Sequence, residues 1–367
     1  MRFHVLLLPN VGWAELRERV VRLEALGVEV AALADHVADW TNPSVPWLGT
    51  WTVLPALAEA TRTIRLTTVV SQIPPRNPVM LARQLLTLDH VSGGGVELGL
   101  GTGIRNDPSC AMVGMPNWEP AERVTRFGEY VDFVGRLLSE EVSTYRGSHC
   151  RAEGAVLPRP VQTPRPSKLL AAMGGQMLRL AARDADIWNS LSFLADVSSQ
   201  LAETSERCRA IDAACVAIGR DSSTLRRSIT MYDARARAKG GAMGYYESAD
   251  AFVEQVSHLT ELGISDVGPY YPLDPAQVPA FERIAADVLP TLMAAHPSIR
   301  LGLVQAMGWA SNSGAREGLP YTDGWHGRTR WTLSLRGRRQ PDRVSARLTP
   351  CRGPAPAGAA PRRRSSA

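Results

Sequence analysis

Short apolar runs alternate with amphipathic stretches along residues 1–297. The run FHVLLL (3–8) precedes a stretch whose apolar residues recur at helical spacing, namely Leu16, Val20, Leu23 and Leu26. Gly27 ends that stretch at a C-cap position, and a second apolar run, VEVAALA (28–34), follows it. The pattern therefore predicts a strand, a helix and a second strand in succession.

The same unit recurs to the end of this region. Further apolar runs cover 63–70, 95–101, 168–173, 186–191, 225–232 and 266–271, and helical patterns cover 51–61, 78–91, 120–138, 176–184, 195–217, 248–262 and 275–295. The runs are almost continuously apolar, as parallel strands covered on both faces should be. Eight strand–helix units predict an α/β protein with the TIM (β/α)8 barrel architecture.

A doubly wound open sheet is the alternative architecture. In that case GLGTG (99–103) would be a dinucleotide-binding loop. Its glycines at 99, 101 and 103 do not match G-x-G-x-x-G, and the segment does not follow the first strand. The barrel is therefore the preferred prediction.

In a TIM barrel the active site lies at the carboxyl ends of the strands. The candidates are therefore the polar residues that follow the apolar runs: Asp35, His36 and Trp40; Thr67, Thr68 and Ser71; Thr102, Arg105, Asn106 and Asp107; Gly174, Gly175 and Gln176; and Asn189 and Ser190. We expect these residues to converge on one mouth of the barrel.

Four stretches closely resemble the luciferase-like monooxygenase superfamily. They are ALAEATRTIRLTTVVSQIPPRNPVMLARQLLTLDHVSGGGVELGLGTG (56–103), 146–166, RLAARDADIWN (179–189) and FVEQVSHLTELGISDV (252–267). They follow the family's own order, and the likeness spans residues 3 to about 295. The resemblance implies a TIM barrel, an oxidoreductase that uses a reduced flavin or deazaflavin, and an insertion at 143–166 before strand 5.

The end of strand 2 reads D-H-x-x-x-W (35–40). This motif looks like the branch of the family that uses the deazaflavin coenzyme F420, in which the histidine faces the reacting carbon and the tryptophan walls the substrate pocket. The resemblance makes Asp35, His36 and Trp40 the predicted catalytic residues. Hydride transfer requires a proton to move in step, and imidazole titrates near neutral pH, so His36 is the predicted proton carrier. A helical turn after strand 2 would place His36 and Trp40 on one side.

One departure from the family pattern concerns the second acid–base group. The F420-dependent sugar-phosphate dehydrogenases that this branch contains carry a glutamate after G-T-G, whereas GTGIRND has Ile104 there. Sugar-phosphate oxidation is therefore not expected. Asp107 or Asp39 could replace that acid, but the sequence places neither carboxylate.

The cofactor is expected to lie against glycine-rich strand ends, because glycine tolerates close backbone approach. The family pattern implies a non-prolyl cis peptide near Thr68–Val69, and MGGQ (173–176) precedes a helix whose free N–H groups suit a phosphate. The predicted cofactor-binding residues are Thr68, Val69, Gly101, Thr102, Gly103, Asn106, Met173, Gly174, Gly175 and Gln176. Coenzyme F420 is the expected cofactor and FMN the alternative.

Charge divides the chain into two parts. From Arg300 onward there are 13 arginines, no lysine and 3 acidic residues, a net charge of +10, whereas residues 1–299 carry 28 basic and 33 acidic residues, a net charge of −5. Since the end of the chain also lacks an apolar period, we predict a barrel domain over 1–298 and a disordered basic tail over 299–367. The tail either binds nucleic acid or an anionic surface, or is read-through translation, and we prefer the latter because the family's barrel ends near His296.

Three functions remain open from the sequence. The first is an F420-dependent oxidoreductase acting on a small molecule, the second an FMN-dependent monooxygenase fed by a separate reductase, and the third a nucleic-acid-binding or non-catalytic module. The five cysteines show no zinc-site spacing, so no metal is expected, and the absence of a signal peptide or membrane span predicts a cytoplasmic protein. By family habit we expect a homo-oligomer.

Overall fold

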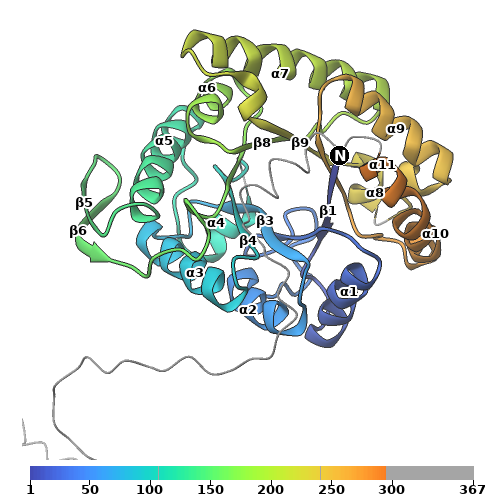
Figure 1. Cartoon of the computed structure of the whole chain (residues 1–367), viewed down its shortest axis with the longest axis horizontal. Coiled ribbons are helices and arrows are strands. Elements are labelled where there is room, and N and C mark those ends of the chain that lie inside the picture. The colour runs from blue at the N-terminus through green and yellow to red at the C-terminus, as the bar shows by residue number, and fades with distance from the viewer. Residues whose placement is uncertain (106, 240, 295–367) are drawn as a thin grey trace, which may run out of the picture. The chain divides into compact units, whose positions relative to one another are not determined.

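Eight parallel strands close into a barrel in the computed structural model, which describes residues 1–105, 107–239 and 241–294 (Figure 1). The strands are β1 (Arg2–Leu7), β2 (Val30–Asp35), β3 (Arg65–Gln72), β4 (Val96–Gly101), β7 (Lys168–Ala171), β8 (Ile187–Ser190), β9 (Arg226–Met231) and β10 (Asp266–Pro269). Their order around the barrel is β1-β10-β9-β8-β7-β4-β3-β2, so strands adjacent in sequence are adjacent in space. The predicted TIM barrel is confirmed.

Helices cover the outside of the barrel (Figure 1). The longer ones are α1 (Trp13–Ala25), α2 (Thr50–Ala60), α3 (Pro78–Val91), α5 (Pro120–Leu137), α6 (Gly175–Asp184), α7 (Val197–Ala217) and α9 (Ala249–Glu261). Their apolar stripes are buried: α5, for example, buries Phe127, Val131 and Val134 at helical spacing. Removing these stripes from water is the main favourable term in folding.

The predicted helix over 275–295 is interrupted. It consists of a 3₁₀ turn (Pro275–Gln277), α10 (Val278–Arg283), a π turn (Ile284–Val288) and α11 (Leu289–Ala294). Pro290 has no N–H to donate to the preceding turn, which explains why regular α-helix does not run through this point. The remaining short elements are α4 (Pro108–Met112), α8 (Ala234–Lys239) and 3₁₀ turns at Ser222–Thr224 and Gly244–Tyr246.

An antiparallel hairpin lies between α5 and β7. Its strands are β5 (Val142–Arg146) and β6 (Arg151–Val156). It occupies the segment that was predicted as an insertion before the fifth barrel strand, so that prediction is confirmed. The predicted tail, 299–367, lies outside the described residues, and the domain boundary at 298 stays a prediction.

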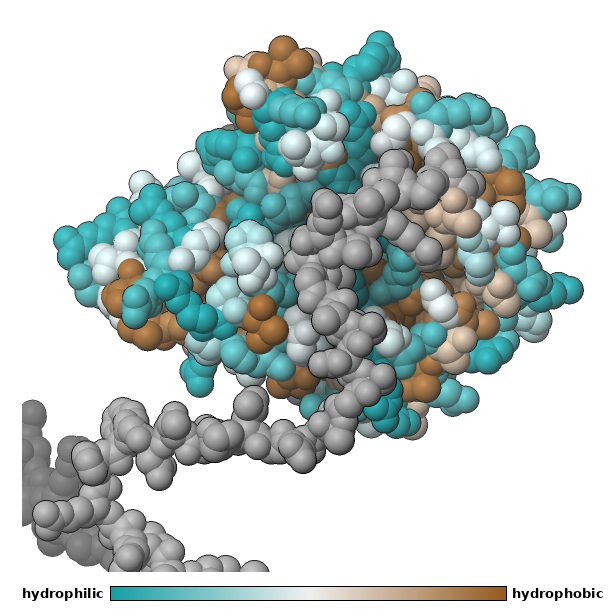
Figure 2. Space-filling model, viewed as in Figure 1, coloured by the Kyte–Doolittle hydropathy of each residue, from teal (hydrophilic) through white to brown (hydrophobic). Residues whose placement is uncertain are grey.

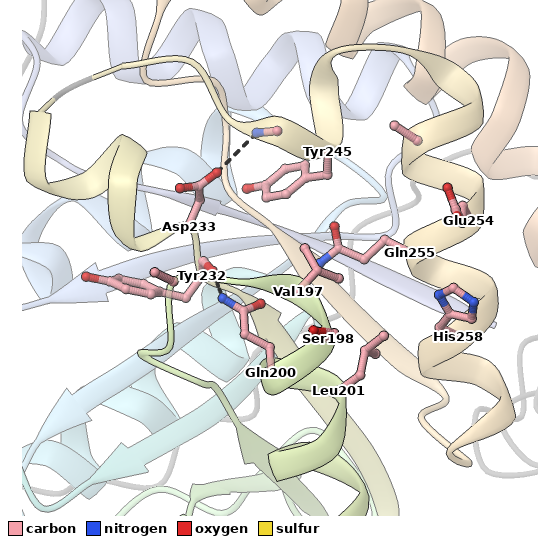
Figure 3. A pocket seen from close by; sticks show the side chains of 13 residues that line it. Val197, Ser198, Gln200, Leu201, Tyr232, Asp233, Tyr245, Glu254, Gln255 and His258 are labelled. Carbon is pink, nitrogen blue, oxygen red and sulfur yellow. Dashed lines mark hydrogen bonds between the residues drawn. The ribbon is translucent and has the colours of Figure 1, made fainter.

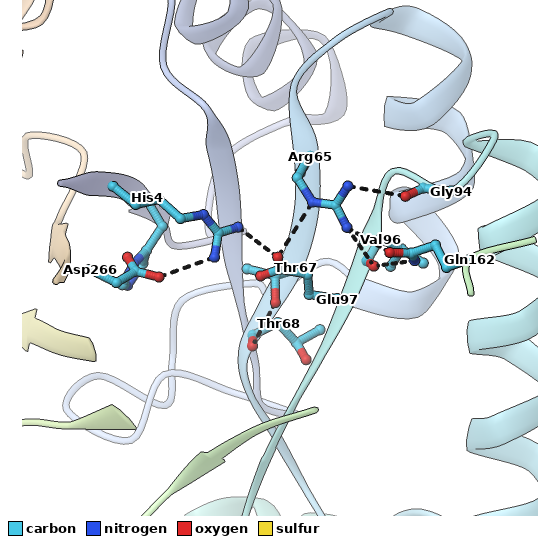
Figure 4. A network of polar contacts seen from close by, with 10 residues as sticks. His4, Arg65, Thr67, Thr68, Gly94, Val96, Glu97, Gln162 and Asp266 are labelled. Atoms are coloured by element: carbon cyan, nitrogen blue, oxygen red, sulfur yellow. Dashed lines mark hydrogen bonds and ion pairs between the residues drawn. The ribbon is translucent and has the colours of Figure 1, made fainter. Parts of the chain in front are cut away.

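An ionic network fills the barrel at the amino ends of its strands (Figure 4). Arg2 donates to Asp266 at 3.1 Å and to Glu97 at 2.8 Å, and Nδ1 of His4 lies 2.8 Å from Asp266. Nε of Arg65 lies 3.4 Å from Glu97. Buried charges are costly unless they are paired, and both carboxylates here have two partners.

The network also sets how its carboxylates titrate. Burial raises the pKa of Asp266, but Arg2 and His4 outweigh burial and lower that pKa to about 2. Burial opposes ionisation of Glu97 as well, and the charges of Arg2 and Arg65 lower its pKa. The charged side chains at this end of the barrel are therefore buried and paired with opposite charges. In a TIM barrel the reactive residues are expected at the other end, where the strands have their carboxyl ends.

Candidate active site

His36 follows β2 directly and is partly buried at the mouth of the barrel. Its Nδ1 lies 3.2 Å from Oδ2 of Asp107, and Nε2 of Gln72 contacts the same nitrogen. Gln72 also donates to Oδ2 of Asp107 at 2.8 Å. The ends of β2, β3 and β4 thus bring three polar side chains together, as the carboxyl ends of barrel strands should.

Asp107 has a second contact, as the N-cap of α4. Its Oδ1 accepts the backbone N–H of Ser109 at 2.8 Å, while Oδ2 faces His36. Oγ of Ser109 in turn accepts the backbone N–H of Val37 at 3.3 Å, which ties α4 to the loop that follows β2. Burial raises the pKa of Asp107, but hydrogen bonds from His36, Ser109 and Gln72 hold that pKa well below its usual range. The carboxylate is therefore ionised at neutral pH.

This contact fixes how the imidazole can act. Two partners make opposite demands on Nδ1 of His36: the carboxylate of Asp107 accepts from an Nδ1–H, whereas the amide nitrogen of Gln72 donates to an Nδ1 without hydrogen. We assign the hydrogen of the neutral ring to Nδ1, because a hydrogen bond to an ionised carboxylate is the stronger of the two. Nε2 then keeps its lone pair, and it has no hydrogen-bond partner among the described residues. An imidazole oriented by a carboxylate in this way can accept a proton at Nε2 and return it.

The two other predicted carboxylates lie elsewhere. Asp35 is buried, pairs with Arg76 and accepts the indole N–H of Trp51 at 3.0 Å. Asp39 accepts from Arg237 at 2.8 Å, and both side chains are 5% exposed. Of the two acids that could replace the family's glutamate, the structure brings Asp107 to His36 and holds Asp39 in a separate ion pair.

Trp40 does not lie on the same side as His36 in a helical turn. Residues 36–49 form bends and turns, because no helical pattern begins before the predicted helix at 51. Trp40 instead packs with Tyr232 and Phe193, at ring-centroid distances of 6.3 and 6.1 Å. The indole beside His36 is that of Trp47, at 6.1 Å and an interplanar angle of 84°. Sequence periodicity could not identify it, because loop geometry decides the contact.

The predicted cis peptide is present one bond later than expected. It joins Val69 to Val70, not Thr68 to Val69. The sequence offers no signal that would distinguish the two bonds, because neither precedes a proline. Oγ1 of Thr68 is already bonded to the carbonyl of Gly99, at 2.9 Å.

The glycines of GLGTG are explained by protein contacts. A Cβ on Gly99 would lie 1.8 Å from the carbonyl oxygen of Thr68, and one on Gly101 would lie 2.4 Å from the side chain of Val70. Gly103 has φ +76°, and a Cβ there would meet Gln72 at 2.8 Å. These glycines therefore allow β3 and the side chain of Gln72 to approach β4, which is a simpler reason than contact with a cofactor.

Other residues predicted at the mouth either bond to neighbouring protein groups or are exposed. Oγ1 of Thr102 donates to the carbonyl of Gly103 at 3.0 Å. Arg105 is 64% exposed and lies 3.6 Å from Glu119, and Asn189 donates to Ser228 at 3.0 Å. Asn106 lies outside the described residues.

The segment Met173–Gln176 is open to solvent at the start of α6. A Cβ on Gly174 would meet no atom within 4 Å, so there is room for a ligand in front of the helix. The N-terminal N–H groups of a ten-residue helix favour an anion. Among the predicted cofactor residues that the structure describes, these four are exposed, whereas Thr102 and Gly103 are partly buried and the others are buried.

A pocket of about 470 Å³ opens between α7 and α9 (Figure 3). Its lining includes Gln200, Tyr232, Asp233, Glu254 and His258. Figure 3 shows the phenol of Tyr232 directed away from the other labelled side chains. The pocket therefore lies beside the aromatic group that packs on Trp40 and does not contain His36.

On the face drawn in Figure 2, hydrophobic residues lie scattered among hydrophilic ones in the described part of the chain. None of the described helices is long and apolar enough to cross a membrane.

Comparison with known proteins adds to this geometry. The family model described as luciferase-like monooxygenase matches residues 1–281. The chain belongs to the luciferase-like monooxygenase family. Proteins of this family are flavin- or F420-dependent oxidoreductases.

Curated relatives match part of the chain. An F420-dependent glucose-6-phosphate dehydrogenase of Intrasporangium calvum is 32% identical over 192 residues, which are 48% of this chain and 56% of the relative. The luciferase-like chain thus spans about half the length of the curated relatives it matches.

Solved structures support the fold. The F420-dependent tetrahydromethanopterin reductase of Methanopyrus kandleri has a TM-score of 0.64 and 17% identity, with 79% of this chain and 99% of that one covered. A long-chain alkane monooxygenase has a TM-score of 0.65 and 14% identity, with 80% and 91% covered. At these identities the likeness establishes the barrel fold. The reaction has to be argued from the residues of this chain.

Proposed function

We propose that this chain is an F420-dependent oxidoreductase that transfers a hydride to or from a small organic substrate, with His36 as the proton carrier. The observation that carries the proposal is the contact of 3.2 Å between Nδ1 of His36 and the ionised carboxylate of Asp107. It leaves Nε2 of His36 as the base and acid at the mouth of a barrel of the luciferase-like family.

The residues of this chain fit the cofactor at two places. The exposed start of α6, Met173–Gln176, would hold a phosphate group, and the open space at Gly174 leaves room for it. The turn at Thr102 and Gly103 borders His36 through Gln72 and would lie near the ring. When bound, the deazaflavin supplies or accepts the hydride. Asp107 then keeps the imidazole oriented, so that a proton can enter or leave at Nε2.

A fluorescence titration of the full chain with oxidised F420 and, separately, with FMN tests this proposal. We expect F420 to bind at least tenfold more tightly than FMN. The reverse preference would contradict the proposal and favour an oxygen-using monooxygenase supplied by a separate reductase. Oxygen consumption that depends on reduced FMN would then be the next measurement.

The curated relatives that are named as glucose-6-phosphate dehydrogenases do not extend that substrate to this chain. Ile104 stands where the sugar-phosphate branch is expected to carry its glutamate, and Asp107 supplies the carboxylate from three residues further on. The different position of the acid is our reason to propose a substrate other than a sugar phosphate.

A further inference from the structure

Arg237 is a buried cation at the mouth of the barrel. It lies on α8, which follows β9, and its side chain is 5% exposed. Its Nη2 donates to Oδ1 of Asp39 at 2.8 Å, and its Cζ lies 6.0 Å from the ring centroid of Tyr270. Its Nε is shielded from solvent and has no hydrogen-bond partner among the described residues. A buried donor normally has an acceptor, so this nitrogen requires an explanation.

An exposed ion pair elsewhere in the molecule shows how the same two donors of a guanidinium can be filled. Nε and Nη2 of Arg22 donate to the two carboxylate oxygens of Glu282, at 2.7 and 3.0 Å. Any carboxylate or phosphate that presents two oxygens matches these parallel donors. Asp39 meets Nη2 of Arg237 and leaves Nε unpaired within the described part of the chain. The guanidinium of Arg237 is therefore an oxyanion site that is only half filled.

Asp39 is held in place by its own turn. Its Oδ1 accepts the backbone N–H of Thr41 at 2.8 Å and the Thr41 hydroxyl at 2.7 Å, in addition to the bond from Arg237. Burial raises the pKa of Asp39, but the hydrogen bonds from Thr41 and the charge of Arg237 lower that pKa below its usual value. The carboxylate is therefore ionised at neutral pH, and it neutralises Arg237 without using both of its donors.

The pair spans part of the mouth. Asp39 lies in the loop after β2 and Arg237 in the helix after β9, and the strand order β2-β1-β10-β9 places the ends of two strands between them. The next residue, Trp40, stacks on Tyr232 at a ring-centroid distance of 6.3 Å. The ion pair therefore borders the aromatic group at the mouth, where a substrate would enter.

We propose that Asp39 is a built-in anion that occupies Arg237 and thereby excludes substrates that carry a phosphate or carboxylate group. Such a group would meet the negative charge of Asp39 first, and it could bind both donors of Arg237 only by displacing that carboxylate. The expected substrate is therefore an uncharged organic molecule. The inference deepens the proposed function and rests on it for the role of the mouth as the substrate site.

The test removes the charge of Asp39 and keeps its shape. Asp39→Asn retains an oxygen for Thr41 and leaves Arg237 without its anion. Inorganic phosphate is the probe, added to the full chain without F420, with sodium chloride at the same ionic strength as the reference. We expect phosphate to raise the urea midpoint of Asp39→Asn and to leave that of the wild type nearly unchanged. The affinity for phosphate should be higher in the variant by about tenfold or more.

Two further variants identify the site. Asp39→Asn combined with Arg237→Met should lose the phosphate response, because the cation has been removed. Glu282→Gln leaves Arg22 without its partner in the exposed pair and is the matched control. It should show no phosphate response, because water already surrounds that guanidinium.

Two outcomes would overturn the inference. In one, the wild type and Asp39→Asn respond equally to phosphate, and in the other, the response survives Arg237→Met. If Asp39→Asn does not fold, the wild type labelled with ¹⁵N at arginine decides. Its Arg237 Nε resonance, assigned with Arg237→Met, should not move with phosphate, and a shift would mean that Asp39 does not exclude anions. These measurements use no F420, so their failure is distinct from failure of the proposed function, which the F420 titration tests.

Discussion

Two histidine–carboxylate pairs occupy opposite ends of this barrel. At the amino ends of the strands, Nδ1 of His4 lies 2.8 Å from Asp266, and both side chains are 2% exposed. At the carboxyl ends, Nδ1 of His36 lies 3.2 Å from Asp107, and the histidine is 16% exposed. The two pairs share their chemistry and differ in what surrounds the second ring nitrogen.

That difference separates a structural pair from the pair that we propose to be reactive. Nε2 of His4 is buried and faces Gly268, where a Cβ would lie 1.9 Å away, so no ligand can reach it. Asp266 is further neutralised by Arg2. The side chain of His36 is partly exposed, and its Nε2 has no hydrogen-bond partner in the described part of the chain. Access to the second nitrogen, and not the residue types, distinguishes the two ends.

Replacement of His36 by alanine should have the largest effect on activity. We expect F420-dependent turnover of the organic substrate to fall by about 10²- to 10⁴-fold, because a positioned acid–base group contributes on that order. F420 affinity and the urea midpoint should change little. His4→Ala is the matched variant and should do the opposite: it should lower the urea midpoint and leave turnover unchanged. Unchanged turnover in His36→Ala would remove its proposed role.

Replacement of Asp266 by asparagine should have the largest effect on stability. It leaves Arg2 and His4 without their shared buried anion, and breaking such a pair costs about 3–5 kcal/mol. Urea unfolding followed by circular dichroism measures the loss. Glu153→Gln in the exposed pair with Arg146 is the control and should be silent. Equal effects of the two variants would contradict a special role for the buried network.

Acid should weaken the same network. The pKa of Asp266 is about 2 in the folded state, below the ordinary value of 3.8, so the folded state binds fewer protons than the unfolded state between these values. Its contribution, on the order of 2 kcal/mol, is present above about pH 4 and is lost as pH falls toward 2. Urea unfolding at several pH values should show the difference between wild type and Asp266→Asn shrinking with acid. A pH-independent difference would argue against this linkage.

Replacement of Asp107 by asparagine should give the smallest effect. Asparagine still caps α4 but no longer fixes the Nδ1 hydrogen of His36, so we expect a loss of turnover of about tenfold with unchanged F420 affinity and a displaced pH–rate profile. Asp196→Asn alters the N-cap of α7 in the same way and is the matched control. If both variants leave the pH–rate profile unchanged, Asp107 is only a cap.

The barrel could be predicted from the sequence because its strands and helices bury long apolar patterns. The ionic end could not, because Arg2 and His4 lie within or beside a strand that reads as apolar, and only the closed barrel brings them to Glu97 and Asp266. Asp107 was a candidate that the sequence could not place. The sequence predicted Trp40 as the indole at the site and left Trp47 as either a pocket-lining or a packing residue, because a loop without periodicity carries no signal for which indole meets His36.

The N-cap at Asp107 links two properties that are usually separate. One oxygen of its carboxylate begins a helix of five residues, and the other orients an imidazole. Fraying of α4 would withdraw the anion from His36, so the local folding equilibrium of this short helix also determines the fraction of molecules ready to move a proton.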